Sequence, residues 1–284
     1  YSGVLDLKLP VDTVNTFQTE GSIPITSNAV LSNIYPSLHP NHVLRISVQG
    51  NGSAPIFGVV TPDRTRVLWP NKFPLEAICD STGTRRKTKG TGVSLHHRAF
   101  NTELGFGGYK SPLMHLLTSK EIPCVTCVGP AGCGKTLCAI TSAFYLLTRA
   151  PKSTFARIMY MRPLVTMGDD LGTLPGDKNR KMEEWIKPAE DNICSIFGGS
   201  GTTRSDIIKG FRQMIHEGVF CPEPPSYMPG RSIDDTIWII DEAHFLTREH
   251  VKLLLQRAGK NTKVILCGDP SQVNAGRHRH ITAH

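Results

Sequence analysis

A glycine-rich segment at residues 129–136 has the residue types and the spacing needed to hold a chain of phosphates. It reads Gly-Pro-Ala-Gly-Cys-Gly-Lys-Thr, which is the pattern G-x-x-x-x-G-K-T. Glycines allow backbone conformations that side chains forbid, so the loop amides can point at phosphate oxygens, assisted by the positive end of the following helix. The lysine would reach the β- and γ-phosphates, and the threonine hydroxyl would ligate Mg²⁺. The residues predicted to bind the nucleotide are Gly129, Pro130, Ala131, Gly132, Cys133, Gly134, Lys135 and Thr136.

A pair of acidic residues about a hundred positions later could complete a hydrolytic site. The apolar run 236–240 ends in Asp-Glu-Ala-His at 241–244. At the end of a buried strand, Asp241 fits the acidic residue that contacts Mg²⁺ through water in phosphate-loop folds. Glu242 would orient and deprotonate the attacking water. The alternative is an acidic start to an ordinary loop after a strand.

A glutamine and an arginine are further candidates for a catalytic role. The run 263–267 is followed by Gly-Asp-Pro-Ser-Gln, and polar residues that leave a parallel strand lie at the edge where ligands bind. Gln272 could sense the γ-phosphate or the water, although an ordinary Gly-Asp-Pro turn has the same sequence. Arg231 could be an arginine finger for its own site or for a neighbouring subunit, or it could bind loop carbonyls. The predicted catalytic set is Lys135, Glu242, Gln272 and Arg231, and the predicted metal ligands are Thr136 and Asp241.

The elements that must position these residues alternate between strand and helix. Apolar strand-like runs occupy 124–128, 157–161, 236–240 and 263–267, and amphipathic helical patterns occupy 137–148, 178–197, 206–216 and 247–257. This alternation indicates βα units and a parallel sheet. The predicted fold class is α/β, a P-loop NTPase parallel sheet with flanking helices, preceded by a small β-rich domain.

The first 80 residues have a different pattern. Short runs that alternate apolar and polar residues are separated by turn signals, as in half-buried strands. Residues 1–80 therefore form a predicted β-rich domain, in which Tyr35, Phe57 and Trp69 could stack on bases or pack in the core. A basic segment at 81–92 is a predicted flexible linker. It could bind a phosphate backbone or be a solvated loop. Residues 93–284 form the predicted ATPase domain.

The composition favours an anionic partner. The chain has 284 residues and a formal net charge of +8, so nucleic acid is the leading candidate. Arg162, which leaves the run 157–161, could meet phosphate or nucleic acid, or form a surface salt bridge. No apolar run approaches the ~20 residues that span a bilayer, so we expect no membrane association and a soluble, cytoplasmic protein. The eight cysteines indicate a reducing compartment, and the C-x-x-C at 124–127 is interpreted as core packing.

Several of these segments together resemble the PhoH family of ATPases, over about residues 95–275. They are Arg-Pro at 162–163, Leu-Gly-x-Leu-Pro-Gly-Asp at 171–177, Tyr-Met-x-Gly-Arg-Ser at 227–232, Asp-Glu-Ala-His at 241–244 and Gly-Asp-Pro-Ser-Gln at 268–272. The resemblance implies a phosphate-loop ATPase related to superfamily-one helicases, which acts on RNA as a homo-oligomer, often a hexameric ring. It implies that Lys135, Thr136, Asp241 and Glu242 hydrolyse ATP and that Gln272 senses the nucleotide. The family usually has an arginine where this chain has Pro229.

Two functions follow as hypotheses from different classes. The first is an RNA-directed ATPase, helicase-like, that uses ATP and Mg²⁺ to remodel RNA or another single-stranded nucleic acid. The second is a nucleotide-gated RNA-binding protein that hydrolyses slowly and regulates a ribonuclease or another RNA-processing partner. A third, a P-loop small-molecule kinase, is disfavoured because a water-activating glutamate beside Asp241 suits hydrolysis.

Overall fold

The structure is a computed structural model that describes the chain in separate stretches. These are residues 5–9, 12, 14–15, 20, 22–26, 28–48, 56–68, 110–148, 154–163, 178–198, 202–223 and 232–272. The chain forms two compact units, one made of Tyr1–Leu75 with Gly105–Leu116 and the other of Glu76–Leu104 with Leu117–His284. The predicted linker at 81–92 lies outside the described residues. Helix α4 (Lys110–Thr118) spans the division between the units.

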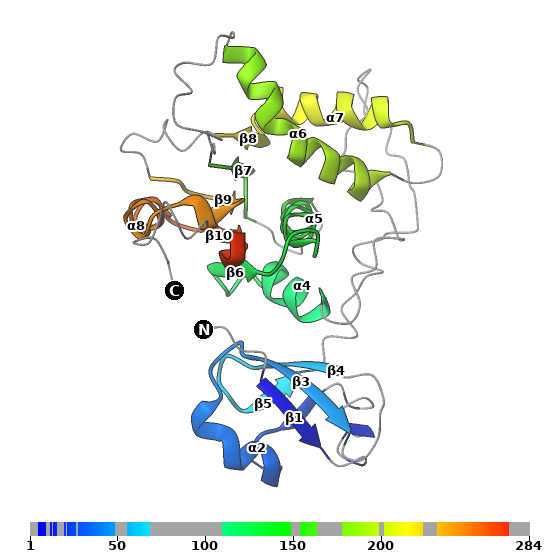
Figure 1. Cartoon of the computed structure of the whole chain (residues 1–284), viewed down its shortest axis with the longest axis vertical. Helices are drawn as coiled ribbons and strands as arrows, with labels where there is room; N and C mark the ends of the chain where they lie inside the picture. The colour runs from blue at the N-terminus through cyan, green and yellow to red at the C-terminus, as the bar shows by residue number, and fades with distance from the viewer. Residues whose placement is uncertain are drawn as a thin grey trace. The chain divides into compact units, whose positions relative to one another are not determined.

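The first unit contains a five-stranded sheet in the order β1-β3-β4-β5-β2 (Figure 1). The strands pair antiparallel except for β1 and β3, which are parallel. Along β1, Leu7 and Leu9 are buried and Asp6 and Lys8 are exposed, as the alternating sequence predicts. The elements are β1 (Leu5–Leu9), β2 (Ser22–Pro24), α2 (Ala29–Ile34), β3 (Val43–Val48), β4 (Ile56–Val60) and β5 (Arg66–Leu68).

The aromatic residues of this unit differ from one another in burial. Tyr35 is 39% exposed, so core packing, one of its two predicted alternatives, is wrong. The guanidinium of Arg64 lies 4.3 Å from the centre of the Tyr35 ring, and its Nη2 donates to the Tyr35 carbonyl at 2.7 Å. Arginine thus covers one face of the ring by a cation–π contact. Phe57 is half-buried, and Trp69 lies outside the described residues.

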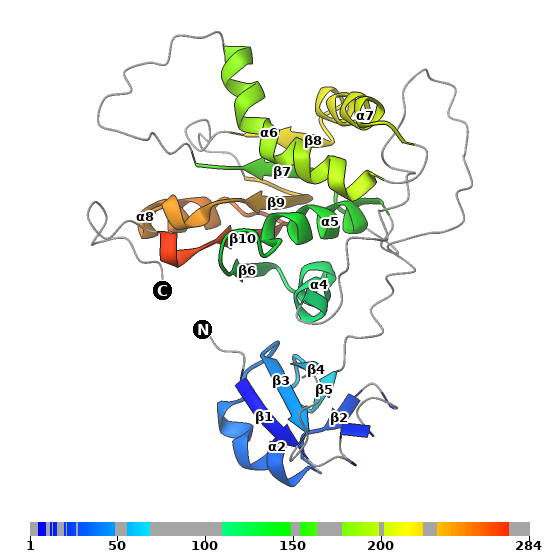
Figure 2. The same cartoon turned by 45° about the vertical axis from the view of Figure 1, so that its right-hand side comes forward.

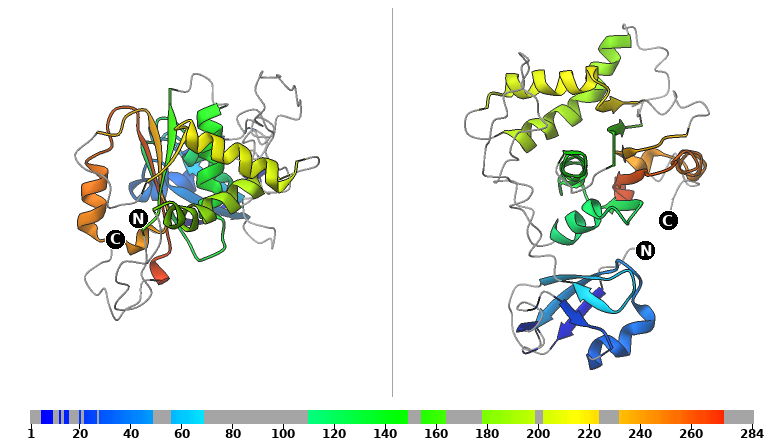
Figure 3. Two further views of the ribbon diagram at one scale, coloured as in Figure 1. Left: turned by 90° about the horizontal axis from the view of Figure 1, so that it is seen from above. Right: turned by 180° about the vertical axis from the view of Figure 1, so that it is seen from behind.

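The second unit contains a parallel sheet of five strands in the order β6-β10-β9-β7-β8 (Figure 2). Viewed along the sheet, α8 lies on one face and α5, α6 and α7 lie on the other (Figure 3, left). The strands are β6 (Cys124–Val128), β7 (Arg157–Met161), β8 (Phe220–Pro222), β9 (Thr236–Ile240) and β10 (Lys263–Gly268). The helices are α5 (Lys135–Thr148), α6 (Lys178–Phe197), α7 (Arg204–His216) and α8 (Arg248–Leu255). The predicted parallel sheet with flanking helices and the separate β-rich region are confirmed.

Burial explains why the central strands have continuous apolar sequences. All five residues of β9 are buried, since helices cover both faces of the sheet. Trp238 is fully buried and packs in one core with Met161 and Val264. Sequence analysis missed β8, which has three residues and ends in Pro222. Proline is tolerated at such a place because an edge strand has unpaired N–H positions.

A buried lysine at the start of β10 donates hydrogen bonds to the segment that precedes β6. Lys263 is 1% exposed, and its Nζ donates to the carbonyls of Ser119 at 2.9 Å and Ile122 at 2.6 Å. Burial lowers the pKa of this ammonium group to about 8, because the charged form is poorly solvated there. The two carbonyls replace the water that the lysine loses.

The cysteines of the described part of the chain are free. In the C-x-x-C segment, Cys127 is buried as predicted, but Cys124 is exposed, so its predicted packing in the core is wrong. Cys138 and Cys267 are also buried, and Cys133 is half-buried. None of the helices in the described stretches has the length and apolar character that crossing a bilayer requires.

Candidate nucleotide-binding site

The glycine loop joins β6 to α5 at the carboxyl edge of the parallel sheet. Gly132 and Gly134 have φ angles of 75° and 89°, in the left-handed region that favours glycine. A Cβ atom on Gly129 would lie 3.0 Å from Sγ of Cys133. The helix begins with the Cys138 N–H donating to the Gly134 carbonyl at 2.9 Å. The loop thus has the strand, turn and helix that a phosphate-binding loop requires.

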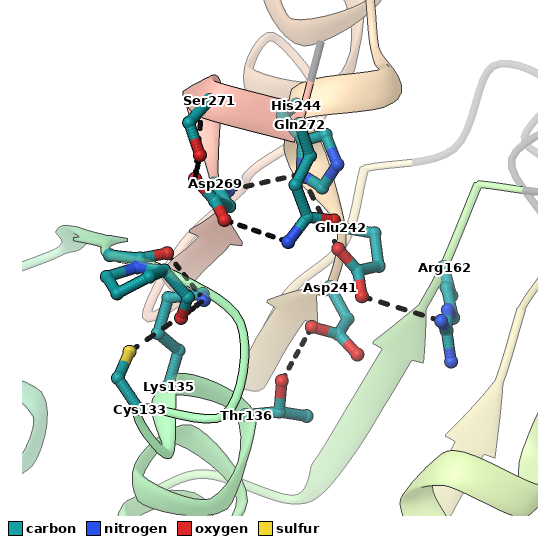
Figure 4. A network of polar contacts seen from close by, with 12 residues as sticks. Cys133, Lys135, Thr136, Arg162, Asp241, Glu242, His244, Asp269, Ser271 and Gln272 are labelled. Atoms are coloured by element: carbon teal, nitrogen blue, oxygen red, sulfur yellow. Dashed lines mark hydrogen bonds and ion pairs between the residues drawn. The ribbon is translucent and has the colours of Figure 1, made fainter. Parts of the chain in front are cut away.

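The ammonium group of Lys135 lies against the loop itself. Its Nζ donates to the carbonyls of Gly129 at 2.7 Å and Pro130 at 2.8 Å, and lies 3.8 Å from Sγ of Cys133 (Figure 4). A phosphate chain bound to the loop would compete with these carbonyls for the lysine, since charge-assisted bonds to phosphate are stronger than bonds to neutral carbonyls.

Asp241 is buried at the end of β9 and has two side-chain donors. Thr136 Oγ1 donates to its Oδ1 at 2.8 Å, and the Tyr160 hydroxyl donates to its Oδ2 at 2.8 Å. Asp241 is only 4% exposed. The pKa of Tyr160 is raised, first by burial and then by the charge of Asp241, so the phenol remains a donor. The carboxylate is therefore held between the helix of the glycine loop and β7.

Glu242 follows in a left-handed backbone conformation, with φ 52° and ψ 39°. Neighbouring residues of an extended strand point to opposite faces, so this turn lets Glu242 reach the same edge as Asp241. Figure 4 shows both carboxylates at this edge. Glu242 Oε1 lies 3.4 Å from Nη2 of Arg162, and each of the two side chains is 30% exposed. Arg162 is therefore in a salt bridge, which was one of its two predicted alternatives.

His244 connects this edge to the segment that follows β10. Its side chain is 2% exposed, and burial lowers its pKa. The Asp269 N–H donates to His244 Nδ1 at 3.1 Å, so Nδ1 carries no proton and the ring is neutral. A Cβ atom on Gly268 would lie 3.3 Å from the His244 backbone nitrogen, a close contact that favours glycine at this position. Sequence analysis gave His244 no role. Its position two residues after Glu242 is the only sequence signal that we find for it.

Gln272 lies at the same edge, bound to Asp269. Its Nε2 donates to Asp269 Oδ2 at 2.8 Å, and the Ser271 hydroxyl donates to Oδ1 at 2.6 Å. Hydrogen bonds, that from the Ser271 side chain foremost, lower the pKa of Asp269. The Gly268 carbonyl accepts from the Gly129 N–H at 3.3 Å, which links this segment to the glycine loop.

The structure thus brings five of the predicted side chains to one edge of the sheet, namely Lys135, Thr136, Asp241, Glu242 and Gln272. The predicted arginine finger, Arg231, lies outside the described residues.

Thr136 and Asp241 form a donor set that suits Mg²⁺. A hydroxyl and a carboxylate are hard oxygen ligands, and Mg²⁺ commonly takes one or two protein ligands and completes its octahedron with phosphates and water. Within the described stretches, no three His, Cys, Asp or Glu side chains cluster closely enough to hold a metal on their own. The residues present therefore fit a cation that arrives with a phosphate chain.

The parallel sheet, the loop between β6 and α5 and the carboxylate at the end of β9 define a P-loop NTPase fold. A family model described as "PhoH-like protein" matches residues 110–282, which is more than half of the chain. The chain therefore belongs to the PhoH-like family.

Curated relatives agree with this assignment. The chain is 32% identical to Protein PhoH2 of Bacillus subtilis over 259 residues, which are 88% of this chain and 56% of that protein. It is 34% identical to the PhoH-like protein of the same organism over 147 residues, 52% of this chain and 42% of that protein. A Protein PhoH2 from Thermobispora bispora is 30% identical over 60% of this chain and 37% of its own length. The chain thus spans roughly half the length, or less, of these relatives.

Proposed function

We propose that this protein is an ATP-hydrolysing, RNA-directed ATPase with helicase-like remodelling activity. The observation that carries the proposal is the hydrogen bond between Thr136 and Asp241. It joins the phosphate-binding loop to the acidic pair, so that a bound triphosphate and its attacking water would share one site.

Each side chain at this edge has a chemical role in the proposal. Loop amides and Lys135 hold the β- and γ-phosphates, and Thr136 and Asp241 hold Mg²⁺. When bound, Mg²⁺ neutralises charge on the phosphates. Glu242 orients the attacking water and takes its proton. Gln272 contacts the γ-phosphate, so the segment after β10, to which it belongs, responds to the bound nucleotide.

RNA is proposed as the partner on grounds of charge. The net charge of +8 favours a polyanion. Arg162 adds a guanidinium at the ligand-binding edge of the sheet. We also propose that the protein assembles as a homo-oligomer, which sizing in solution tests directly.

Two substitutions test hydrolysis. Lys135→Ala removes the phosphate-binding ammonium, so nucleotide affinity or turnover falls. Glu242→Gln keeps nucleotide binding but lowers turnover about 10²–10⁴-fold, the usual contribution of a general base. Glu217→Gln is the control, because it makes the same change on an exposed glutamate at the end of α7. Equal turnover in wild type and Glu242→Gln would remove Glu242 as the base.

The ion pair between Arg162 and Glu242 favours a second candidate function. A carboxylate that is paired with a guanidinium is a weaker base toward the attacking water, so ATP hydrolysis would be slow. Slow hydrolysis is what a nucleotide-gated RNA-binding regulator would show. Strand displacement that requires ATP turnover supports the first function. ATP-dependent RNA binding without displacement supports the second.

A further inference from the structure

Arg162 and Glu242 are held opposite each other by the pairing of two strands. Met161 of β7 is in register with Ile240 of β9, and the Asp241 N–H continues the ladder by donating to the Met161 carbonyl at 2.8 Å. Arg162 directly follows Met161, and Glu242 directly follows Asp241. The strand pairing therefore places the two residues near each other at the same edge of the sheet.

Among the described residues, Glu242 has salt-bridge distances to Arg162 and His244, but the two are not equivalent. His244 Nδ1 lies 3.5 Å from Glu242 Oε2 and already accepts from the Asp269 N–H, so it has no proton to offer Glu242. Arg162 is permanently charged and lies 3.4 Å from Oε1. The arginine therefore provides the positive charge that faces the proposed base.

The exposure of the pair makes it easy to break. Both side chains are 30% exposed, and ion pairs near the surface change an equilibrium by about a factor of five at most. A guanidinium binds phosphate through two parallel hydrogen bonds, which is a stronger arrangement than the 3.4 Å contact with the Glu242 carboxylate. A phosphate group near Arg162 would therefore compete well with Glu242.

The position of Arg162 favours a phosphate other than the one that Lys135 would hold. Strands β10 and β9 separate β6, which precedes the glycine loop, from β7, which precedes Arg162. Figure 4 shows Arg162 on the side of Glu242 away from Lys135. The basic charge of the chain points to a nucleic-acid backbone as the source of that second phosphate.

We propose that Arg162 restrains Glu242 until a backbone phosphate of a nucleic-acid strand takes the guanidinium. Strand binding then frees the carboxylate to accept a proton from the attacking water. This inference rests on the proposed ATPase function for its consequence. The competition itself concerns strand binding alone and can be measured without hydrolysis.

Binding of a fluorescently labelled single-stranded RNA, followed by anisotropy, tests the competition. Glu242→Gln removes the competing charge with little change of shape, so RNA affinity rises by up to about fivefold. Arg162→Ala lowers RNA affinity and reduces the salt dependence by about one phosphate contact. In the Arg162→Ala background, Glu242→Gln no longer has an effect, because the two residues act through one contact. Arg162→Lys keeps the charge and restores part of the salt dependence.

Arg204→Ala is the matched control. Arg204, the first residue of α7, forms an exposed ion pair with Asp191 of α6 at 2.6 Å. The Arg204→Ala variant should show the same rise of RNA affinity on Glu242→Gln as the wild type. The proposal is overturned if Glu242→Gln has no effect on RNA affinity, or if its effect persists without Arg162. It is also overturned if the Arg162 dependence appears in nucleotide affinity and not in RNA affinity, because the competing phosphate is then that of the nucleotide.

An ATPase assay on the same proteins shows the consequence. Arg162→Ala raises turnover without RNA by up to about fivefold and lowers the stimulation by RNA by a similar factor. Unchanged or reduced turnover in Arg162→Ala, with hydrolysis still dependent on Glu242, overturns the restraint and leaves the proposed function intact. Loss of the Glu242 dependence overturns the proposed function instead.

Discussion

The hydroxyl of Thr136 donates to Oδ1 of Asp241 at 2.8 Å, although 105 residues separate the two in the chain. Both residues were predicted to contact Mg²⁺ from their separate sequence contexts. The contact shows that the fold brings the two contexts together, since α5 and β9 meet at the carboxyl edge of the sheet.

Removing the Thr136 hydroxyl should weaken the response to Mg²⁺. Thr136→Val keeps the shape of the side chain but removes a ligand, so the Mg²⁺ concentration for half-maximal activity rises at least about tenfold. Thr136→Ser, which keeps the hydroxyl, should stay near wild type. A titration of ATPase activity with Mg²⁺ measures the difference. Similar midpoints for the valine and serine variants would contradict the role of Thr136.

Tyr160→Phe should weaken the positioning of the Asp241 carboxylate. It removes the donor to Oδ2 of a buried carboxylate, a bond to a charged group that contributes about 1.5–3 kcal/mol. We expect a loss of stability in this range and a rise of about tenfold in the Mg²⁺ midpoint. Urea unfolding and the same Mg²⁺ titration provide the measurements. Loss of stability with an unchanged midpoint would make Tyr160 a core residue only.

A comparison of Gly132→Ala with Gly218→Ala distinguishes the effect of backbone strain from an effect on nucleotide binding. Gly132 and Gly218 have φ angles of 75° and 71°, and neither has an atom within 4 Å of an added Cβ. Alanine at either position should cost about 1–2 kcal/mol of stability through the left-handed backbone. Only Gly132→Ala should also weaken nucleotide binding, because Gly218 lies beyond the end of α7. A fluorescent nucleotide titration on both variants decides this, and equal affinities would argue against a role of the loop.

Lys263 should make stability depend on pH in the alkaline range. Its pKa is about 8 in the folded chain and 10.5 in the unfolded chain, so the unfolded state binds more protons between these values. The penalty for burying the charge is fully present below pH 8 and is relieved as the pH rises towards 10.5. Relative to Lys263→Met, the wild type should gain up to about 3 kcal/mol over this range.

Urea titrations at several pH values provide the test for Lys263. Lys252→Met is the control, since it removes an exposed lysine of α8 and should preserve the pH dependence of the wild type. Parallel stability curves for the wild type and Lys263→Met would show that the buried ammonium keeps its ordinary pKa.

Local sequence pattern was sufficient for most of the second unit. After their first residues, Arg157 and Thr236, the runs at 157–161 and 236–240 are apolar because both faces of their strands are buried, and β7 and β9 have the predicted bounds. The glycine loop was predicted because the spacing of its glycines, lysine and threonine is what phosphate binding requires. The three-residue strand β8 was missed, since so short an element leaves no period to detect.

The partners of the carboxylates could not be predicted in the same way. Tyr160 lies inside an apolar strand and has the sequence context of a core residue, yet it donates to Asp241. The contact of Arg162 with Glu242 depends on which residues of β7 and β9 are paired, and a sequence does not state the register of two strands 80 positions apart. Core packing of Tyr35, one of its two predicted alternatives, was wrong for a related reason, because its ring contacts the guanidinium of Arg64, which is distant in the sequence.

Strand β7 and the residue just after it provide a partner for each acid of the site. Tyr160 within the strand donates to Asp241, and Arg162, which directly follows the strand, pairs with Glu242. A shift of this segment by one position would remove the Tyr160 and Arg162 contacts at once, although Thr136 would still donate to Asp241. A single inserted or deleted codon in this segment would therefore disturb both carboxylates together, whereas a substitution at Tyr160 or Arg162 changes the contact of only one.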